Sequence, residues 1–362
     1  MTSALPACCL IASDRLYQLS TNASPGEGVK ITVVDEATNA PMQDEGLLGM
    51  RLMLLMRVIR EGGLPIFERE IGYKEIHRHL LLLLGFSGGL ASQDIVAIAG
   101  YEKAQVSRAI KPLERDGLVE REKLRSRLTL LPPGKLLFER IRAIARARDG
   151  LLTAGIDPHE LQRFGVLTDE LAQQAARIYG QERCLSAEAG IISAVGGASG
   201  PPVWPSGPDG KPVEPPADLI TPKLVGLVAY LKRSAMLACQ RTHGLSNFQG
   251  QVLSLIGLYS PLPMARLITA MGRDKSQIGR TVSALEEAGL IHRLRPTRRR
   301  DIVLQLTDPG AAVFRAMYDE TVRREADLWI AENETDRMFY QDMVDRLIAR
   351  ARALIEEGKS AA

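Results

Sequence analysis

The sequence predicts a mainly α-helical chain with small two-stranded β-hairpins, built from two copies of one unit and a linker. Residues 103–121 return as residues 275–293, without a gap, and the Lys, Gln, Arg, Leu, Glu and Gly positions match. Apolar residues recur at helical spacing through both stretches. Between the copies, residues 196–217 are dominated by Gly and Pro, which is typical of a linker.

Length and composition are ordinary for a soluble globular chain of two or three domains. Apolar residues make up 45% of the 362 residues and charged residues 25%, and the net charge of +3 is too small to identify a partner. The longest apolar runs, such as 80–86, are far shorter than the roughly 20 residues of a membrane span. Because no export signal is convincing either, we expect a cytoplasmic protein without a membrane partner.

The four cysteines show neither metal-binding nor disulfide spacing. Cys184 and Cys239 are isolated, while the neighbouring pair Cys8 and Cys9 leaves an oxidation sensor open as an alternative to two free thiols. We expect no cofactor and no metal site. The sequence also has no P-loop, no GxGxxG after a strand and no GxSxG, so we do not expect an enzyme.

Domain boundaries follow from the composition. We expect an irregular arm at 1–43, a first unit at 44–180, a linker at 181–218, a second unit at 219–357 and a tail at 358–362. Helices of the first unit are expected at 46–60, 71–84, 93–99, 102–115, 132–148 and 158–178. The second unit repeats this order, from a long helix at 219–241 to a helical pair that starts at 307–310 and runs to about residue 356.

The repeated stretch has the pattern of a helix-turn-helix followed by a hairpin. In each copy a short helix, a turn with Gly and an amphipathic helix precede two short strands, at 118–121 and 128–131 in the first copy. Val106, Ile110 and Leu113 form the expected buried face, as do Ile278, Val282 and Leu285. The second helix of such a pair fits the DNA major groove, so the sequence predicts two winged helix-turn-helix domains.

The residues opposite these buried faces are the candidates for contact with double-stranded DNA. They are small residues, or Arg, Lys, Gln and Ser, which can bond to base edges and phosphates. On the two helices the candidates are Gln105, Ser107, Arg108, Lys111, Lys275, Ser276, Gln277, Arg280 and Ser283. Basic residues also crowd both hairpin tips, where they can reach the minor groove; these are Lys123, Arg125, Arg127, Arg295, Arg298, Arg299 and Arg300.

Residues 262–310 resemble the winged helix of the MarR transcriptional regulators. The resemblance rests on Leu267–Gly272, Asp274–Val282, Leu285–Ile291, Arg298–Asp301 and Leu306–Gly310, and residues 90–134 look like a more divergent copy. It implies a transcription factor that works as a symmetric homodimer, whose first and last helices make the dimer interface and whose subunits each read half of a palindromic operator. We expect a repressor, although the sequence does not give the sign of regulation. Two copies in one chain suggest an intramolecular pseudo-dimer, although further pairing of two chains stays open.

The resemblance also implies release of DNA by a small aromatic acid or phenol that binds between the dimer helices and the winged helix, and in other members by thiol oxidation. Residues that can line such an effector site are Met53, Met56, Arg60, His79 and His243. For each of them, core packing or surface pairing is the competing interpretation. A winged-helix adaptor that binds protein and not DNA is the competing function.

The two copies differ in ways that predict unequal contributions to DNA binding. The match of residues 131–134 to 307–310 makes the second wing four residues longer, and the first wing lacks the Arg-Arg-Arg-Asp sequence of the second. Pro112 removes one backbone hydrogen bond from the first recognition helix, so we expect its last turn to bend. The sequence therefore predicts a pseudo-palindromic and asymmetric operator.

Overall fold

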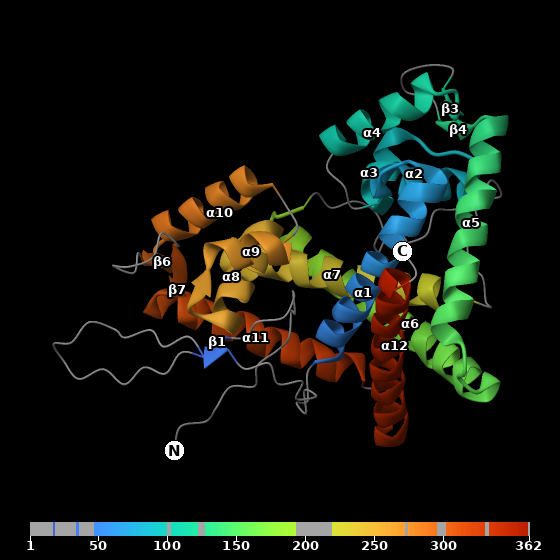
Figure 1. The fold of residues 1–362 in the computed structure, drawn as a ribbon. Coiled ribbons are helices and arrows are strands. Elements are labelled where there is room, and N and C mark those ends of the chain that lie inside the picture. The colour runs from blue at the N-terminus through green and yellow to red at the C-terminus, as the bar shows by residue number, and fades with distance from the viewer. Residues whose placement is uncertain are drawn as a thin grey trace. The chain divides into compact units, whose positions relative to one another are not determined.

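The computed structural model describes residues 17–18, 34–35, 47–99, 103–121, 127–192, 219–271, 274–294, 302–329 and 333–360. The chain divides into two compact units. The larger unit contains residues 48–247 and 318–362, and the smaller unit contains residues 1–47 and 248–317. Helices dominate both units and the sheets are small, which confirms the predicted mainly α class (Figure 1).

Long helices form the centre of the larger unit, which we call the helical core. They are α1 (Leu48–Ile71), α5 (Pro132–Thr153), α6 (Pro158–Glu188), α7 (Ile220–His243) and α12 (Glu334–Ser360). Helix α6 packs along α7, and α12 packs along α1. Leu52, Leu224 and Leu347 are fully buried in one apolar cluster, so helices distant in sequence share a single core.

The larger unit also carries the first winged segment, which we call the first head (residues 75–130). It contains α2 (Glu75–Ser87), α3 (Ser92–Ala99), α4 (Lys103–Arg115), β3 (Val119–Glu120) and β4 (Thr129–Leu130). The strands pair antiparallel, Val119 with Leu130, as the sequence predicts for a wing. Val106, Ile110 and Leu113 lie in a second apolar cluster with α2 and with Phe138 of α5, which confirms the predicted buried face of α4.

The smaller unit carries the second head (residues 248–306). Its elements are α8 (Asn247–Tyr259), β5 (Leu262–Pro263), α9 (Met264–Met271), α10 (Lys275–Glu287), β6 (Ile291–Leu294) and β7 (Val303–Leu306). Strand β7 lies between β5 and β6, both antiparallel to it. Helix α11 (Asp308–Leu328) begins in this unit and ends in the larger one, and β1 (Tyr17–Gln18) pairs with β2 (Val34–Asp35).

The helices recur at constant offsets along the chain. Helices α7, α8, α9 and α10 follow α1, α2, α3 and α4 at one fixed spacing, which is the spacing from Leu48 to Ile220. Helices α11 and α12 follow α5 and α6 at a slightly longer fixed spacing, which is that from Pro132 to Asp308. The spacing lengthens between the strands of the wing, where the sequence predicts the longer second hairpin.

Close packing recurs at the same offsets. A Cβ on Gly85 would lie 2.3 Å from the Phe138 ring, and one on Gly257 would lie 2.4 Å from the Phe314 ring. Gly134 and Gly310 pass equally close to backbone, since a Cβ there would lie 2.0 Å from Leu118 O and 1.8 Å from Leu290 O. Each head therefore needs glycine where the helix after the wing crosses the wing strand.

Two predicted helix ends were wrong, and one strand was not predicted. Helix α1 continues past Arg60 to Ile71, through Gly62, Gly63 and Pro65. Arg148 of α5 donates hydrogen bonds to the Gly62 carbonyl (2.8 Å) and the Ile59 carbonyl (3.1 Å), which stabilises the helix just before its proline. Helix α6 runs to Glu188 and not to Ile178, and in this added part Glu182 accepts a hydrogen bond from Arg241 of α7. Strand β5 was not predicted, since two residues carry no alternating pattern.

Gly134→Ala tests the close approach at the wing. The added Cβ would meet the Leu118 carbonyl, so the variant should lose about 2–4 kcal/mol of unfolding free energy. Gly150→Ala on the same helix is the matched control, because a Cβ there meets nothing within 4 Å and should gain about 0.5–1 kcal/mol in helix propensity. Thermal unfolding measures both. Equal unfolding temperatures for the two variants would contradict the packing.

Candidate nucleic-acid interface

Helix α10 presents a polar face whose position is set by its cap and its buried residues. The Asp274 carboxylate accepts hydrogen bonds from the backbone N–H groups of Ser276 (2.8 Å) and Gln277 (3.1 Å), and this fixes the first turn. Ile278, Val282 and Leu285, which the sequence predicts for the buried face of the helix, are fully buried. Lys275, Ser276, Gln277 and Arg280 are consequently exposed on the opposite face.

An open groove follows this exposed face of α10. Its lining includes Ser276, Gly279, Arg280 and Ser283 from the helix, together with Arg293 of β6 and Ile302 next to β7. A Cβ on Gly279 would meet nothing within 4 Å, so packing inside the protein does not require glycine there. Arg280 therefore lines the groove beside small residues, Ser276 and Gly279.

In each head an ion pair links the start of the wing to the helix that precedes it. Arg293 Nε lies 3.2 Å from Glu286 Oε2, and Arg293 Nη2 donates to Ser283 Oγ (2.6 Å). In the first head, Arg121 Nε donates to Glu114 Oε1 at 2.6 Å. These four charged residues were not singled out as structural. The signal was present, because Glu and Arg are among the identities that the two copies share.

Helix α4 presents the corresponding face of the first head. Ser107, Arg108 and Lys111 are exposed, and Gln105 is half-buried at the edge of this face, as the sequence predicts. Arg108 Nε donates to the carbonyl of Ala104 on its own helix (3.2 Å). The helix continues through Pro112 to Arg115 and contains 13 residues, as α10 does, so the proline does not shorten it.

The wing tips lie largely outside the described residues. Arg127 is described: its side chain is exposed, and its guanidinium donates to the Gly89 carbonyl (Nε···O 3.1 Å), which attaches the end of the wing to the turn before α3. The predicted contacts outside the described ranges are Lys123, Arg125, Arg295, Arg298, Arg299 and Arg300.

The structure gives the candidate effector residues different surroundings. Met53 is 39% exposed on α1, whereas Met56 packs against the helical core. Arg60 Nε forms an ion pair with Glu75 Oε2 at 2.8 Å. His79 on α2 interacts electrostatically with Glu75 and Arg233, and His243 at the end of α7 interacts in the same way with Glu320 of α11.

Burial lowers the pKa of both histidines. Desolvation is the main cause for His79 and for His243, and it outweighs the opposing attraction of Glu75 and Glu320 respectively. Both imidazoles are therefore neutral at pH 7. A neutral imidazole can donate one hydrogen bond to a carboxylate but supplies no positive charge.

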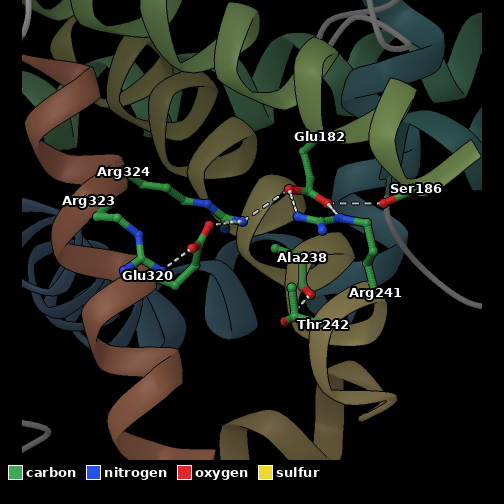
Figure 2. A network of polar contacts seen from close by, with 8 residues as sticks. All are labelled: Glu182, Ser186, Ala238, Arg241, Thr242, Glu320, Arg323 and Arg324. Atoms are coloured by element: carbon green, nitrogen blue, oxygen red, sulfur yellow. Dashed lines mark hydrogen bonds and ion pairs between the residues drawn. The ribbon is translucent and has the colours of Figure 1, made fainter. Parts of the chain in front are cut away.

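A buried carboxylate connects three helices (Figure 2). Glu182 of α6 is 5% exposed, and its two oxygens accept from Arg241 of α7 at 2.7 and 3.0 Å. Arg324 of α11 lies 3.3 Å from Glu182 and 3.2 Å from Glu320, while Ser186 donates to Glu182 at 3.1 Å. Because every charge here has a partner, the network fixes the ends of α6 and α7 against α11.

This network has no counterpart at the corresponding positions of the repeat. Shifted by the offsets above, Glu182 corresponds to Gly358, Arg241 to Arg69 and Arg324 to Arg148. Among the described residues, no group of three or more His, Cys, Asp or Glu side chains could hold a metal ion. Within the same described ranges, no helix has the length and apolar character needed to cross a membrane.

Acidification should destabilise the protein partly through His79. Its folded-state pKa is lowered, so below the ordinary value of about 6.5 the unfolded chain takes up a proton that the folded chain does not. That stability is present above pH 6.5 and is lost as the pH falls. When the pH is lowered from 7.5 to 5.5, the unfolding temperature of His79→Gln should therefore fall by less than that of the wild type. His159→Gln, at an exposed position of α6, should behave as the wild type; equal losses in all three would contradict this account.

Comparison with known proteins relates the first head to one family. Residues 71–126 match the family model described as MarR family. A transcriptional regulatory protein for the hcr operon of Thauera aromatica is 28% identical over 148 residues, which are 38% of this chain and 89% of that protein.

Solved structures of MarR-type proteins are also similar. The crystal structure of MarR is 28% identical, covers 36% of this chain and 98% of that chain, and has a TM-score of 0.32. A MarR family regulator from Listeria monocytogenes, solved with 26mer DNA, is 16% identical, with coverages of 39% and 94% and a TM-score of 0.33. Residues 71–126 are therefore similar to the MarR family, and a longer part of the chain is similar to a transcriptional regulatory protein.

Proposed function

We propose that this protein is a sequence-specific, double-stranded DNA-binding transcriptional repressor with two reading heads. The observation that carries the proposal is the open groove along α10, lined by Ser276, Gly279, Arg280 and Ser283. These are the residue types that bond to bases and phosphates, and they lie on the helix that winged helices insert into the major groove. The corresponding exposed residues of α4 support a second reading surface in the same chain.

Arg280 is the residue that we assign to base recognition. Its guanidinium can donate two parallel hydrogen bonds to O6 and N7 of a guanine, the commonest specific contact in the major groove. Gly279 and Ser276 beside it are small enough to let the helix approach the base edges. Lys275 and Gln277 extend the same exposed face, and the wing residues outside the described ranges are assigned to the phosphates and the minor groove.

We further propose that one chain supplies both halves of the dimer that the MarR resemblance implies, with the units at 44–180 and 219–357. Reciprocal hydrogen bonds between the two halves, within the helical core, support this. The N-terminus of α7 donates to Asp149 of α5, at 3.1 Å from Ile220 N and 2.7 Å from Thr221 N. The N-terminus of α1 donates in the same way to Glu325 of α11, at 2.8 Å from Leu48 N.

The number of residues from Asp149 to Glu325 equals the number from the start of α5 to the start of α11. The two carboxylates therefore occupy equivalent positions in the repeat. Each accepts hydrogen bonds from the first helix of the other half. Phe164 and Tyr340 are equivalent by the same spacing, and their rings stack at 4.6 Å. Two equivalent residues touch each other in this way when they lie on a two-fold axis. An internal pseudo-dimer with its axis at this pair accounts for all of these contacts.

A small aromatic acid or phenol is the effector that we propose for release of the operator. Met53, Met56, Arg60, His79 and His243 remain the candidate residues. The neutral state of His79 and His243 favours hydrogen bonding over charge pairing with such an effector. Arg60 already pairs with Glu75, so binding a carboxylate there would require an exchange of partners.

Arg280→Ala should weaken specific DNA binding by about 1–3 kcal/mol, because the base that it contacts no longer receives hydrogen bonds from the guanidinium. Arg352→Ala is the control, since it removes the same charge from an exposed position of α12. Fluorescence anisotropy with a duplex from the protein's own promoter measures both, at several salt concentrations. Unchanged affinity for Arg280→Ala would contradict the docking of α10, and no binding by the wild type at low salt would favour the adaptor function.

The pseudo-dimer predicts one chain per operator duplex. Because both reading heads and both sets of dimer-type helices are present in one polypeptide, saturation should occur at a 1:1 ratio. Analytical ultracentrifugation of the full-length protein with a labelled duplex measures this ratio. A complex of two chains on one duplex, in which each half pairs with its counterpart in another chain, would overturn the intramolecular arrangement while leaving DNA binding intact.

A further inference from the structure

We infer that the two heads do unequal work: the α10 head discriminates bases and the α4 head anchors phosphates. The operator then has one informative half-site and one tolerant half-site. This inference rests on the proposed DNA-binding function and goes beyond it, because it assigns sequence recognition to one head of the chain. It is carried by differences at matched positions on the exposed faces of α4 and α10.

The strongest difference is a charge reversal at the end of the reading helix. Glu287 lines the groove of α10, whereas the matched residue of α4 is Arg115, exposed and 2.9 Å from the Asp116 carboxylate. A carboxylate in the groove repels phosphate, and it can accept a hydrogen bond from the amino group of cytosine. An exposed guanidinium at the same place attracts any phosphate, whatever the sequence.

A second difference lies one turn earlier. Lys111 is exposed on α4, where its ammonium group is a mobile point charge suited to phosphate. The matched residue of α10 is Ser283, whose hydroxyl accepts a hydrogen bond from Arg293 Nη2 at 2.6 Å. That bond and the ion pair with Glu286 position Arg293, which lines the groove, and Ser283 leaves this place on the second head without the charge that Lys111 gives the first.

The matched arginines also differ in their surroundings. Arg280 lies in the groove of α10 next to Gly279, while Arg108 donates to the Ala104 carbonyl beside the bulkier Ser107. A guanidinium that donates to its own helix has fewer N–H groups directed outward for a bidentate contact with guanine. Small neighbours and a defined groove favour close approach to bases, and a cationic exposed face favours the phosphate backbone.

Selection from a pool of duplexes randomised over about 30 base pairs tests the inference with the full-length protein. The retained sequences should contain one strongly preferred half-site and a second position with weak preference. A palindrome with equal preference in both halves would overturn the division of work. No retention of any duplex at low salt would instead overturn the proposed function itself, so the two failures are distinguishable.

Arg280→Ala and Arg108→Ala form a matched pair of variants, because they remove the same residue from equivalent positions. Arg280→Ala should reduce the preference for the selected sequence over a scrambled one about tenfold or more. Arg108→Ala should leave that preference unchanged, weaken binding to both sequences alike and reduce the slope of log affinity against log salt by about 0.9. The reverse pattern, or equal loss of preference in both variants, would overturn the assignment.

Glu287→Arg gives the second head the charge of the first. It should raise affinity for scrambled duplexes and increase the salt slope, so that sequence preference falls while total binding rises. Arg115→Glu is the reciprocal change, and it should weaken binding to all sequences without reducing preference. Circular dichroism checks that these exposed substitutions leave the fold intact. A rise in sequence preference on Glu287→Arg would overturn the role given to the carboxylate.

Discussion

The helical core depends on providing hydrogen-bond acceptors for two helix N-termini that begin inside it. Leu48 is fully buried and Ile220 is 4% exposed, so the first N–H groups of α1 and α7 are shielded from water. Unpaired buried N–H groups are costly, and Leu219, the residue before α7, has no side chain that could accept from them. Carboxylates from Asp149 and Glu325 do so, from helices distant in sequence.

These caps also determine how the chain must be connected. Asp149 is buried and receives two N–H groups, while burial raises the pKa of Glu325 above its usual range even though the Leu48 and Gly49 N–H groups stabilise its charge. Each carboxylate accepts from the N-terminus of a helix that is distant in sequence. Assembly of the helical core therefore also provides the acceptors for these buried N–H groups.

Sequence patterns predicted the features that depend on local spacing. The buried faces of α4 and α10 follow from apolar residues at i, i+4 and i+7, and the two wings follow from strands around a basic turn. The cap at Asp274 was visible as a side-chain acceptor just before the helix. The exposed faces of the candidate interface were predictable for the same reason, because a known buried face of a helix defines the opposite one.

Features that depend on partners distant in sequence were not predictable. Nothing local indicates that Arg148 supports α1 at Gly62, that Glu182 joins two arginines from other helices, or that β5 adds to the second wing. In the candidate site, the wing arginines looked equivalent, but Arg121 and Arg293 pair with Glu114 and Glu286. Which arginine reaches outward is decided by the carboxylate beside it, and this requires the three-dimensional arrangement.

The stacked pair Phe164 and Tyr340 has an evolutionary consequence. In a homodimer, a residue on the two-fold axis contacts its own copy. Every mutation there changes both sides of the contact at once, so the new side chain must pack against another copy of itself. In the arrangement proposed for this chain, the two positions mutate independently, and one can be Phe while the other is Tyr. The single Tyr340 hydroxyl finds its partner in Thr168 at 3.1 Å, where the equivalent residue of the other half is Val344. The proposed pseudo-dimer can thus acquire asymmetry at its centre through single substitutions, which a homodimer of identical chains cannot do.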